Sequence, residues 1–297
     1  IITNNRYFYK EGKGMDFRVI KAEKITETVK ELLMDCNYNI GSDITNALEK
    51  AKETEKSEVG RQVLCQLIEN NKIAHDEQIP LCQDTGMAVL FVQYGDKVVI
   101  DGGSFKNAVT EGVRQAYKEG YLRKSVVNDP VFDRINTKDN TPAIIHTEIV
   151  PGERIVITAG GKGFGSENMS AIKMLTPSYG AEGVIDFVLD TVRKAGPNPC
   201  PPMVVGVGIG GTFEKAAQLA KKATFRSIET SNPDPRYAEM EQQLLDRINK
   251  MGFGPAGLGG TTTALGVNIE TYPTHIAGMP VAVNICCHAA RHKTAAI

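Results

Sequence analysis

The spacing of apolar residues in the first part of the chain is helical. After Met15, apolar side chains recur three and four residues apart in three stretches that polar residues separate. These stretches predict three successive amphipathic helices, near residues 22–36, 43–53 and 57–71. We therefore expect a helical N-terminal portion over about residues 15–78.

The pattern changes from Leu81 onward, where short runs of β-branched and apolar residues alternate with amphipathic segments. The runs that predict strands are AVLFVQYG, KVVIDGG, AIIHTEIV, RIVITA, MVVGVGI, TALGVNI and PVAVNIC. Helices are predicted over SFKNAVTEGVRQAYKEG, with Ser104 as its cap, and near residues 179–194, 212–223 and 235–251. The predicted fold class is mixed α/β, in which the helical portion precedes an α/β body over about residues 79–297.

Composition excludes several classes of protein. With 297 residues, 41% hydrophobic and 23% charged, and a formal net charge of -1, the chain is typical of a globular protein. It lacks the basic excess of a nucleic-acid-binding protein, and apolar runs such as MAVLFV are too short to span a membrane. Six cysteines outside any compact framework fit a reducing compartment, so we expect a cytoplasmic protein. Residues 1–14 precede Met15 and are interpreted as a disordered or expression-derived leader.

Three of the six cysteines lie in turn-forming sequence rather than on an apolar helix face. They are Cys82 in PLCQDTG, Cys200 in GPNPCPP and Cys287 in NICCHAARH. Three thiolates from distant loops can occupy three corners of an iron-sulfur cube and leave the fourth iron open for Lewis-acid chemistry. Free cysteine is also a common buried hydrophobe and no CxxC spacing is present, so the pattern alone leaves a core role open.

The other three cysteines favour a structural role. Cys36 and Cys65 lie within the apolar spacing of predicted helices, and we assign both to the helical core. Cys286 precedes Cys287 at the end of a predicted strand. If the strand alternation continues, only one of these two neighbours can face a given cavity.

Glycine-rich loops follow or precede three predicted strands. The segment Gly206–Gly211 satisfies the dinucleotide pattern GxGxxG, with Glu229 near the expected acidic position, so a nicotinamide-dependent dehydrogenase is an alternative. The loop TAGGKGFGSENMS offers amides and Lys162 to an anion, and GFGPAGLGGTTTALG allows close approach of the backbone. Each loop alone is as readily a tight turn. Together with the turn-borne cysteines, the three loops favour a shared polar cavity around a cluster.

Five segments carry a resemblance to a known family. In chain order they are LCQDTGM, AGGKGFGSENMS, NPCPPMVVGVGIGGT, GPAGLGGTTTALGV and PTHIAGMPVAVNICCHAARH. From about Lys21 to the C-terminus, the chain resembles the alpha subunit of class I iron-sulfur fumarate hydratases, which corresponds to the N-terminal region of the single-chain form. The group also includes L-tartrate dehydratase. Fumarate is favoured by KGFGSENMS, which is similar to the fumarase loop KGGGSEN but has Phe164 where the family usually has glycine.

The resemblance implies site residues by position. A substrate-binding 4Fe-4S cluster is expected on Cys82, Cys200 and Cys287, the last chosen over Cys286 because of its distance to Arg291-His292. Gln83 and Asp84 match residues beside the first ligand. Arg123 matches an arginine that binds a substrate carboxylate, and Gly165 or its neighbour matches the loop whose amide reaches substrate. His275 matches a histidine that faces the site. We expect Asp84 to handle a proton and His275 to bond a carboxylate, which makes these two the catalytic candidates.

The implied reaction is the reversible hydration of fumarate to L-malate. The segment that the family's other domain contributes to the pocket is missing from this chain, so the resemblance implies a separate beta subunit in an α2β2 heterotetramer. Three alternatives stay open. They are a related hydro-lyase that acts on L-tartrate or mesaconate, an NAD-dependent oxidoreductase, and a noncatalytic subunit whose cysteines bind zinc or pack in the core.

Overall fold

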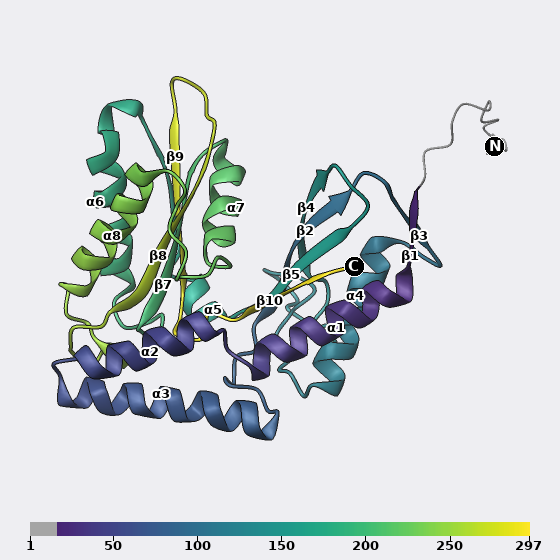
Figure 1. Cartoon of the computed structure of the whole chain (residues 1–297), viewed down its shortest axis with the longest axis horizontal. Coiled ribbons are helices and arrows are strands. Elements are labelled where there is room, and N and C mark those ends of the chain that lie inside the picture. The colour runs from purple at the N-terminus through teal and green to yellow at the C-terminus, as the bar shows by residue number, and fades with distance from the viewer. Residues whose placement is uncertain (1–16) are drawn as a thin grey trace.

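The chain forms two four-stranded sheets that lie side by side, each with its own covering helices (Figure 1). The computed structural model describes residues 17–297, so the predicted leader over residues 1–14 lies outside the described residues. The helices are α1 (Ala22–Tyr38), α2 (Ser42–Thr54), α3 (Glu58–Glu77), α4 (Phe105–Glu119), α5 (Phe164–Glu167), α6 (Gly180–Ala195), α7 (Phe213–Ala223) and α8 (Pro235–Asn249), with short 3-10 turns at Pro177–Tyr179 and Pro255–Gly257. The strands are β1 (Arg18–Lys21), β2 (Met87–Gly95), β3 (Val98–Asp101), β4 (Ile144–Val150), β5 (Ile155–Lys162), β6 (Ala171–Leu175), β7 (Met203–Gly210), β8 (Ala264–Tyr272), β9 (Met279–Cys286) and β10 (His292–Ala296).

The first sheet has the strand order β10-β5-β2-β4 and is covered by α1 and α4. Strand β5 runs antiparallel to both β10 and β2, whereas β4 is parallel to β2. Val29 and Leu33 of α1 pack with Val109 and Val113 of α4, and all four are fully buried. Each such side chain contributes about 1.5 kcal/mol or more when it leaves water, so this core fixes the two helices on the sheet.

The second sheet has the strand order β6-β9-β7-β8 and carries helices on both faces. Apolar side chains of α6 and α8 cover one face, and α7 covers the other, which is turned toward the first sheet (Figure 1). A Cβ on Gly206 or Gly208 of β7 would lie 2.2 Å from Ala220 O or 2.1 Å from Ala216 O. Only glycine therefore allows the backbone of α7 to rest on β7.

The first three helices are divided between the two sheets. Helix α1 belongs to the core of the first sheet, and β1 before it pairs in parallel with β3. Helices α2 and α3 instead run beneath the second sheet (Figure 1), where Leu48 and Leu64 pack with Val204 and Cys286. The predicted order of a helical portion followed by an α/β body is confirmed, but these helices do not form a core of their own.

Most predicted elements are present with boundaries close to those expected. Ser104 caps α4, because its Oγ accepts the N–H of Asn107 at 3.2 Å. Strands β1, β6 and β10 were not predicted. Their sequences RVIK, AIKML and HKTAA lack a sustained apolar alternation, and they are extended because β3, β9 and β5 supply their hydrogen bonds. Across residues 17–297, no helix combines the length and apolar character that crossing a membrane requires.

Several connections cross from one sheet to the other. One links α3, beneath the second sheet, to β2 and contains Cys82. Another links β5 to β6 through the glycine-rich loop over 163–170, and the last links β9 to β10 through Cys287 and residues 288–291. These crossings concentrate loop backbone at the seam between the sheets.

Glu55 ties the end of α2 to the third glycine-rich loop. Its carboxylate is 2% exposed and accepts the N–H groups of Ser57 at 2.9 Å, Thr261 at 2.8 and 3.0 Å, and Thr262 at 2.8 Å. Burial opposes ionisation, but these hydrogen bonds outweigh it and lower the pKa of Glu55 to about 2. The ionised carboxylate therefore holds this loop in place.

We expect Glu55→Gln to lower the free energy of unfolding by about 2 kcal/mol, because several charge-assisted hydrogen bonds weaken. A carboxylate with a depressed pKa stabilises the fold above its ordinary pKa of 4.5, and this contribution is lost as the pH falls toward 2. Urea unfolding of wild type and variant should converge over that pH range. Exposed Glu53→Gln is the control, with a change of about 0.5 kcal/mol or less. An equal gap at all pH values would contradict the assignment.

Candidate active site

Cys82 lies in the turn between α3 and β2. The preceding residue, Leu81, donates its N–H to Asn37 O at 2.9 Å, and Asn70 Nδ2 donates to Leu81 O at 2.8 Å. These bonds fix the turn to α1 and α3. The Cys82 side chain is half-buried against a small apolar cluster that includes Leu81 and Ala289.

Cys200 lies between α6 and β7 in a strained backbone conformation. Its φ of 56° is in the left-handed region, which is uncommon for a residue with a side chain and often marks a functional site. Its carbonyl accepts the N–H of His288 at 3.4 Å. The next carbonyl, of Pro201, accepts the N–H of Ala256 at 2.8 Å. The loop is thus bonded both to the residue after Cys287 and to the third glycine-rich loop, while the thiol stays exposed.

Cys287 follows directly after β9. Cys286, the last residue of the strand, is 7% exposed and packs with Leu48 and Val204, whereas Cys287 is half-buried against the same small cluster as Cys82. The alternation predicted from the sequence therefore separates the two neighbours. Hydrogen bonding to the Cys287 thiol, together with the charges of Lys162 and Arg291, lowers the pKa of Cys286.

The structure brings Cys82, Cys200 and Cys287 to one place. Cys82 and Cys287 pack against the same apolar cluster, and the Cys200 carbonyl bonds the N–H of His288, the residue after Cys287. Burial raises the pKa of Cys200, and Cys287 and Cys82 raise it further. Within residues 17–297, no three His, Cys, Asp or Glu side chains are grouped tightly enough to hold one metal ion. A cube of four irons keeps its thiolates farther apart than a single ion does, so the wider spacing does not conflict with a cluster.

The remaining two cysteines behave differently from each other. Cys36 is fully buried, as predicted, and burial raises the pKa of its thiol to about 12. The core assignment of Cys65 was wrong, since this thiol is exposed on α3. Helix α3 buries Gly60, Leu64 and Ala74, and its position beneath α2 turns Cys65 toward solvent.

Asp84 connects the Cys82 turn to the glycine-rich loop over residues 163–170. Its Oδ1 accepts the N–H of Gly86 at 3.0 Å, and its Oδ2 accepts the N–H of Phe164 at 2.9 Å. Each oxygen keeps a further lone pair. The carboxylate therefore has a fixed orientation and can still accept or share a proton.

Gln83, Arg123 and Gly165 lie on three different segments, each close to the Cys82 turn or to the Cys200 loop. Gln83 is exposed between Cys82 and Asp84. Arg123 has an exposed side chain, and its backbone N–H donates to Thr85 Oγ1 at 2.8 Å, which holds it beside the Cys82 turn. Gly165 lies in the first turn of α5, where a Cβ would be 3.9 Å from Asn198 O, close to the Cys200 loop.

The structure does not bring His275 to this group. His275 is exposed in the connection before β9, with Ala277 N–H donating to its Nδ1 at 3.2 Å. Cys287 follows the other end of β9, and eight strand residues at about 3.3 Å each separate the two. In this chain, His275 instead lines a surface hollow with Thr212 and Tyr272.

The dinucleotide pattern has a structural explanation. Gly206 and Gly208 lie inside β7 rather than in a loop after it, and their role is the close approach of α7. Gly210 and Gly211 form the turn into α7 with φ of 94° and 69°. Glu229 accepts a hydrogen bond from Asn46 at 2.9 Å. The glycines are thus accounted for without a nucleotide.

Sequence reasoning missed a network of buried charges behind the cysteines. Lys162 was expected to be open to an anion, but its side chain is 2% exposed and its Nζ lies 2.8 Å from Ser166 Oγ and 3.2 Å from Glu167 Oε2. Glu167 also pairs with Lys221 of α7 and accepts Asn284 Nδ2 of β9 at 3.0 Å. Burial favours the neutral form of Glu167, but Lys162 and Lys221 outweigh it and lower the pKa. The network clamps the glycine-rich loop to the second sheet.

The donor set fits an iron-sulfur cluster. Three thiols come from crossing or strained loops, and the other three cysteines are buried in the core or lie out on α3. Arg291, four residues after Cys287, is 5% exposed and donates Nη2 to the Asp84 carbonyl. A buried cation beside the thiols suits an anionic group. The position of Arg291 after Cys287 is visible in the sequence, but only the fold shows that Arg291 is buried.

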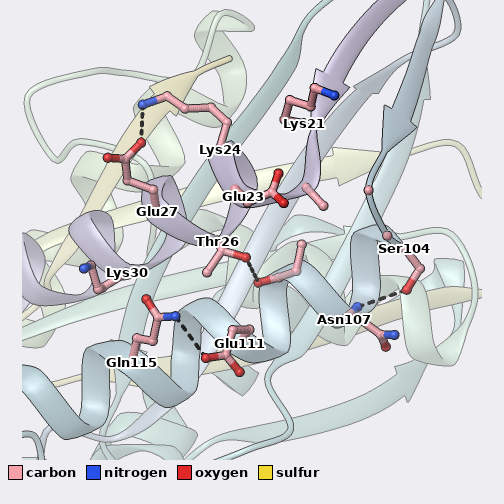
Figure 2. Close-up of a pocket in the computed structure, with 14 residues that line it drawn as sticks. Lys21, Glu23, Lys24, Thr26, Glu27, Lys30, Ser104, Asn107, Glu111 and Gln115 are labelled. Carbon is pink, nitrogen blue, oxygen red and sulfur yellow. Dashed lines mark hydrogen bonds and ion pairs between the residues drawn. The ribbon is translucent and has the colours of Figure 1, made fainter.

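The groove in Figure 2 is separate from these residues. It lies between α1 and α4, has a volume of about 860 Å³, and carries none of the candidate site residues. Within the groove, Lys24 Nζ pairs with Glu27 Oε2 at 2.7 Å, and Gln115 donates to Glu111 at 2.9 Å. We assign this groove no role in the site.

Comparison with known proteins agrees with the geometry. The chain is 44% identical over 273 residues to a provisionally named L(+)-tartrate dehydratase subunit alpha of Methanocaldococcus jannaschii, covering 90% of this chain and 95% of the relative. It is 34% identical over 275 residues to the L(+)-tartrate dehydratase subunit alpha of Escherichia coli, covering 91% and 90%. The family model described as fumarate hydratase (Fumerase) matches residues 26–296. With its three cysteine loops joined at one seam, the chain belongs to the fumarate hydratase (Fumerase) family of hydro-lyases.

Proposed function

We propose that this chain is the alpha subunit of a hydro-lyase that reversibly hydrates fumarate to L-malate with a 4Fe-4S cluster on Cys82, Cys200 and Cys287. The observation that carries the proposal is the convergence of three separate loops, because Cys82 and Cys287 pack against one apolar cluster and the Cys200 carbonyl bonds the N–H of His288. Membership of the family supports the reaction class. The missing fourth thiol suits a cluster whose last iron faces substrate.

The cluster, when bound, supplies a Lewis acid for the substrate hydroxyl and carboxylate oxygens. The chain supplies the groups around it. Arg123 offers a guanidinium to a second carboxylate, and its anchoring to Thr85 sets its distance from the Cys82 turn. Gln83 and the backbone N–H of Gly165 donate hydrogen bonds to substrate oxygens. These fixed donors favour the negative charge that develops on the carboxylate as the C3 proton leaves.

Asp84 is the proton-handling group of this proposal. The amides of Gly86 and Phe164 hold its two oxygens, so the carboxylate cannot turn away from the loop that contains Cys82. Through its remaining lone pairs, the carboxylate accepts a proton from the water that adds and returns it to the hydroxyl that leaves. His275 receives no role at this site, because it lies at the opposite end of β9.

The chain needs a partner to complete the reaction. Among the described residues around the site, Asp84 is the one candidate base, and it is assigned to the hydroxyl side of the reaction. No candidate among them is left to remove the C3 proton. The relatives are named as alpha subunits. We therefore propose a separate beta subunit, in an α2β2 assembly, that brings the C3 base and further cations for the carboxylates.

L-tartrate is the second candidate substrate, because both relatives named above are called tartrate dehydratase subunits. Phe164, which stands where fumarases usually have glycine, is 49% exposed beside Asp84. This departure from the fumarase loop beside Asp84 keeps L-tartrate as the second candidate. The rest of the KGFGSENMS segment, which matches the fumarase loop, favours fumarate.

Anaerobic reconstitution with iron and sulfide tests the cluster. Cys82→Ser, Cys200→Ser and Cys287→Ser should each lose most of the bound iron and sulfide, because each removes one of three thiolates. Cys65→Ser, on the exposed face of α3, and Cys286→Ser should retain both. Iron and sulfide analysis gives the readout. Zinc bound without sulfide, or NAD bound without iron, would favour the other classes of protein.

Kinetics of the reconstituted pair of subunits test the side chains. We expect Asp84→Asn to lower kcat by about 100-fold or more with little change in KM, because it removes proton transfer. Arg123→Met should raise KM and lower kcat/KM, because it removes a carboxylate contact. Lys124→Met, next to Arg123 but with no assigned contact, is the control. Undiminished turnover of either variant would remove that role.

The substrate is decided by the ratio of kcat/KM values for L-malate, L-tartrate and the hydrated form of mesaconate. We expect L-malate to be preferred, and Phe164→Gly, which restores the residue that fumarases usually have, to increase that preference. The alpha chain alone should be inactive on all three. A preference for L-tartrate in wild type would replace fumarate while leaving the hydro-lyase proposal intact.

A further inference from the structure

Arg291 is a buried cation without a carboxylate partner. Its side chain is 5% exposed, and its Nε and Nη1 have no hydrogen-bond partner in the described structure. Its one polar contact is from Nη2 to the neutral carbonyl of Asp84. No ion pair joins Arg291 to an Asp or Glu within residues 17–297.

Such an arrangement is costly without a compensating charge. Moving an ion out of water costs several kcal/mol even after relaxation, and buried arginines are normally paired. Burial acts against the protonated form of Arg291, yet cysteine charges raise its pKa above the ordinary value, with Cys287 and Cys82 first among them. The acidic groups around this cation are therefore thiols rather than carboxylates.

Two of the thiols around Arg291 belong to the proposed cluster site. Cys36 also lies near the guanidinium, but burial raises the pKa of its thiol to about 12, so it stays neutral. Cys286 belongs to the adjacent pair with Cys287. Of the nearby thiols, Cys82 and Cys287 are two of the three proposed ligands, which become thiolates when they bind iron.

The fold keeps a space for the guanidinium. Arg291 ends the crossing from β9 to β10, four residues after Cys287. A Cβ on Gly161 of β5 would lie 3.4 Å from Arg291 Nε and 2.3 Å from Thr85 O. Glycine at this position lets the strand, the Cys82 turn and the arginine meet. The cation is thus placed by backbone packing against two of the three cysteine loops.

We propose that Arg291 is the counter-cation of the cluster, a positioning residue that neutralises the thiolates and binds the Cys82 turn to the Cys287 loop. This inference rests on the proposed iron-sulfur function. Three thiolates carry more negative charge than an oxidised iron-sulfide core carries positive charge, so one fixed cation balances the site. Adding an electron increases the negative charge, so the cation also favours the reduced state.

The test compares Arg291→Met and Arg291→Lys with wild type, in the chain before and after anaerobic reconstitution. Without iron and sulfide, Arg291→Met should unfold at the same or a higher temperature, because an apolar side chain replaces an unpaired buried charge. With the cluster, the same variant should release iron to a chelator about tenfold faster or more. The potential for one-electron reduction, followed by electron paramagnetic resonance, should become more negative. Arg291→Lys should restore most of both properties.

Arg154→Met, a change at an exposed arginine, controls for loss of a cation anywhere in the chain and should match wild type in every measurement. The proposal would be overturned if Arg291→Met lowered the unfolding temperature equally with and without the cluster and left the reduction potential unchanged. The role of Arg291 would then be limited to its hydrogen bond with the Asp84 carbonyl. If wild type itself retains no iron and sulfide, the proposed function fails, and the counter-cation role falls with it. If wild type retains a cluster that Arg291→Met holds equally well, only the counter-cation role fails.

Discussion

The meeting of the three cysteine loops depends on how the chain crosses between its two sheets. Cys82 lies on the crossing into β2, and Cys287 lies on the crossing out of β9. Cys200 reaches them from within the second sheet, because its carbonyl accepts the N–H of His288. The sulfurs therefore become neighbours only when both sheets have formed and their seam has closed.

Two groups of polar contacts hold this seam. Asp84 and Arg291 connect the Cys82 turn to the glycine-rich loop over residues 163–170 and to the Cys287 loop. Glu167 lies between Lys162 and Lys221 and binds β5, β9 and α7 to one another. The first group joins the loops that carry the candidate site residues, and the second fixes the glycine-rich loop to the second sheet. A polar seam of this kind is stable only when its charges are satisfied together.

The sequence predicted those features that local periodicity or turn chemistry determines. The apolar spacing gave the long helices and the seven apolar strands, and the turn residues around Cys82, Cys200 and Cys287 separated these thiols from Cys36. Cys65 was misassigned because helical spacing does not say which face another helix will cover. Strands β1, β6 and β10 depend on pairing partners distant in sequence. Arg291 was overlooked for a similar reason, since its burial comes from β5 and the Cys82 turn.

Gly206 and Gly208 affect the seam between the sheets indirectly, through the position of α7. A methyl group at either position would meet the backbone of α7 and push that helix away from β7. Because Lys221 lies on α7, such a shift would draw it away from Glu167 and loosen the glycine-rich loop over residues 163–170. Two positions that touch no reacting atom should therefore be as intolerant of substitution in a saturation-mutagenesis screen as the cysteines themselves, so mutational sensitivity in this protein will overstate the size of its catalytic centre.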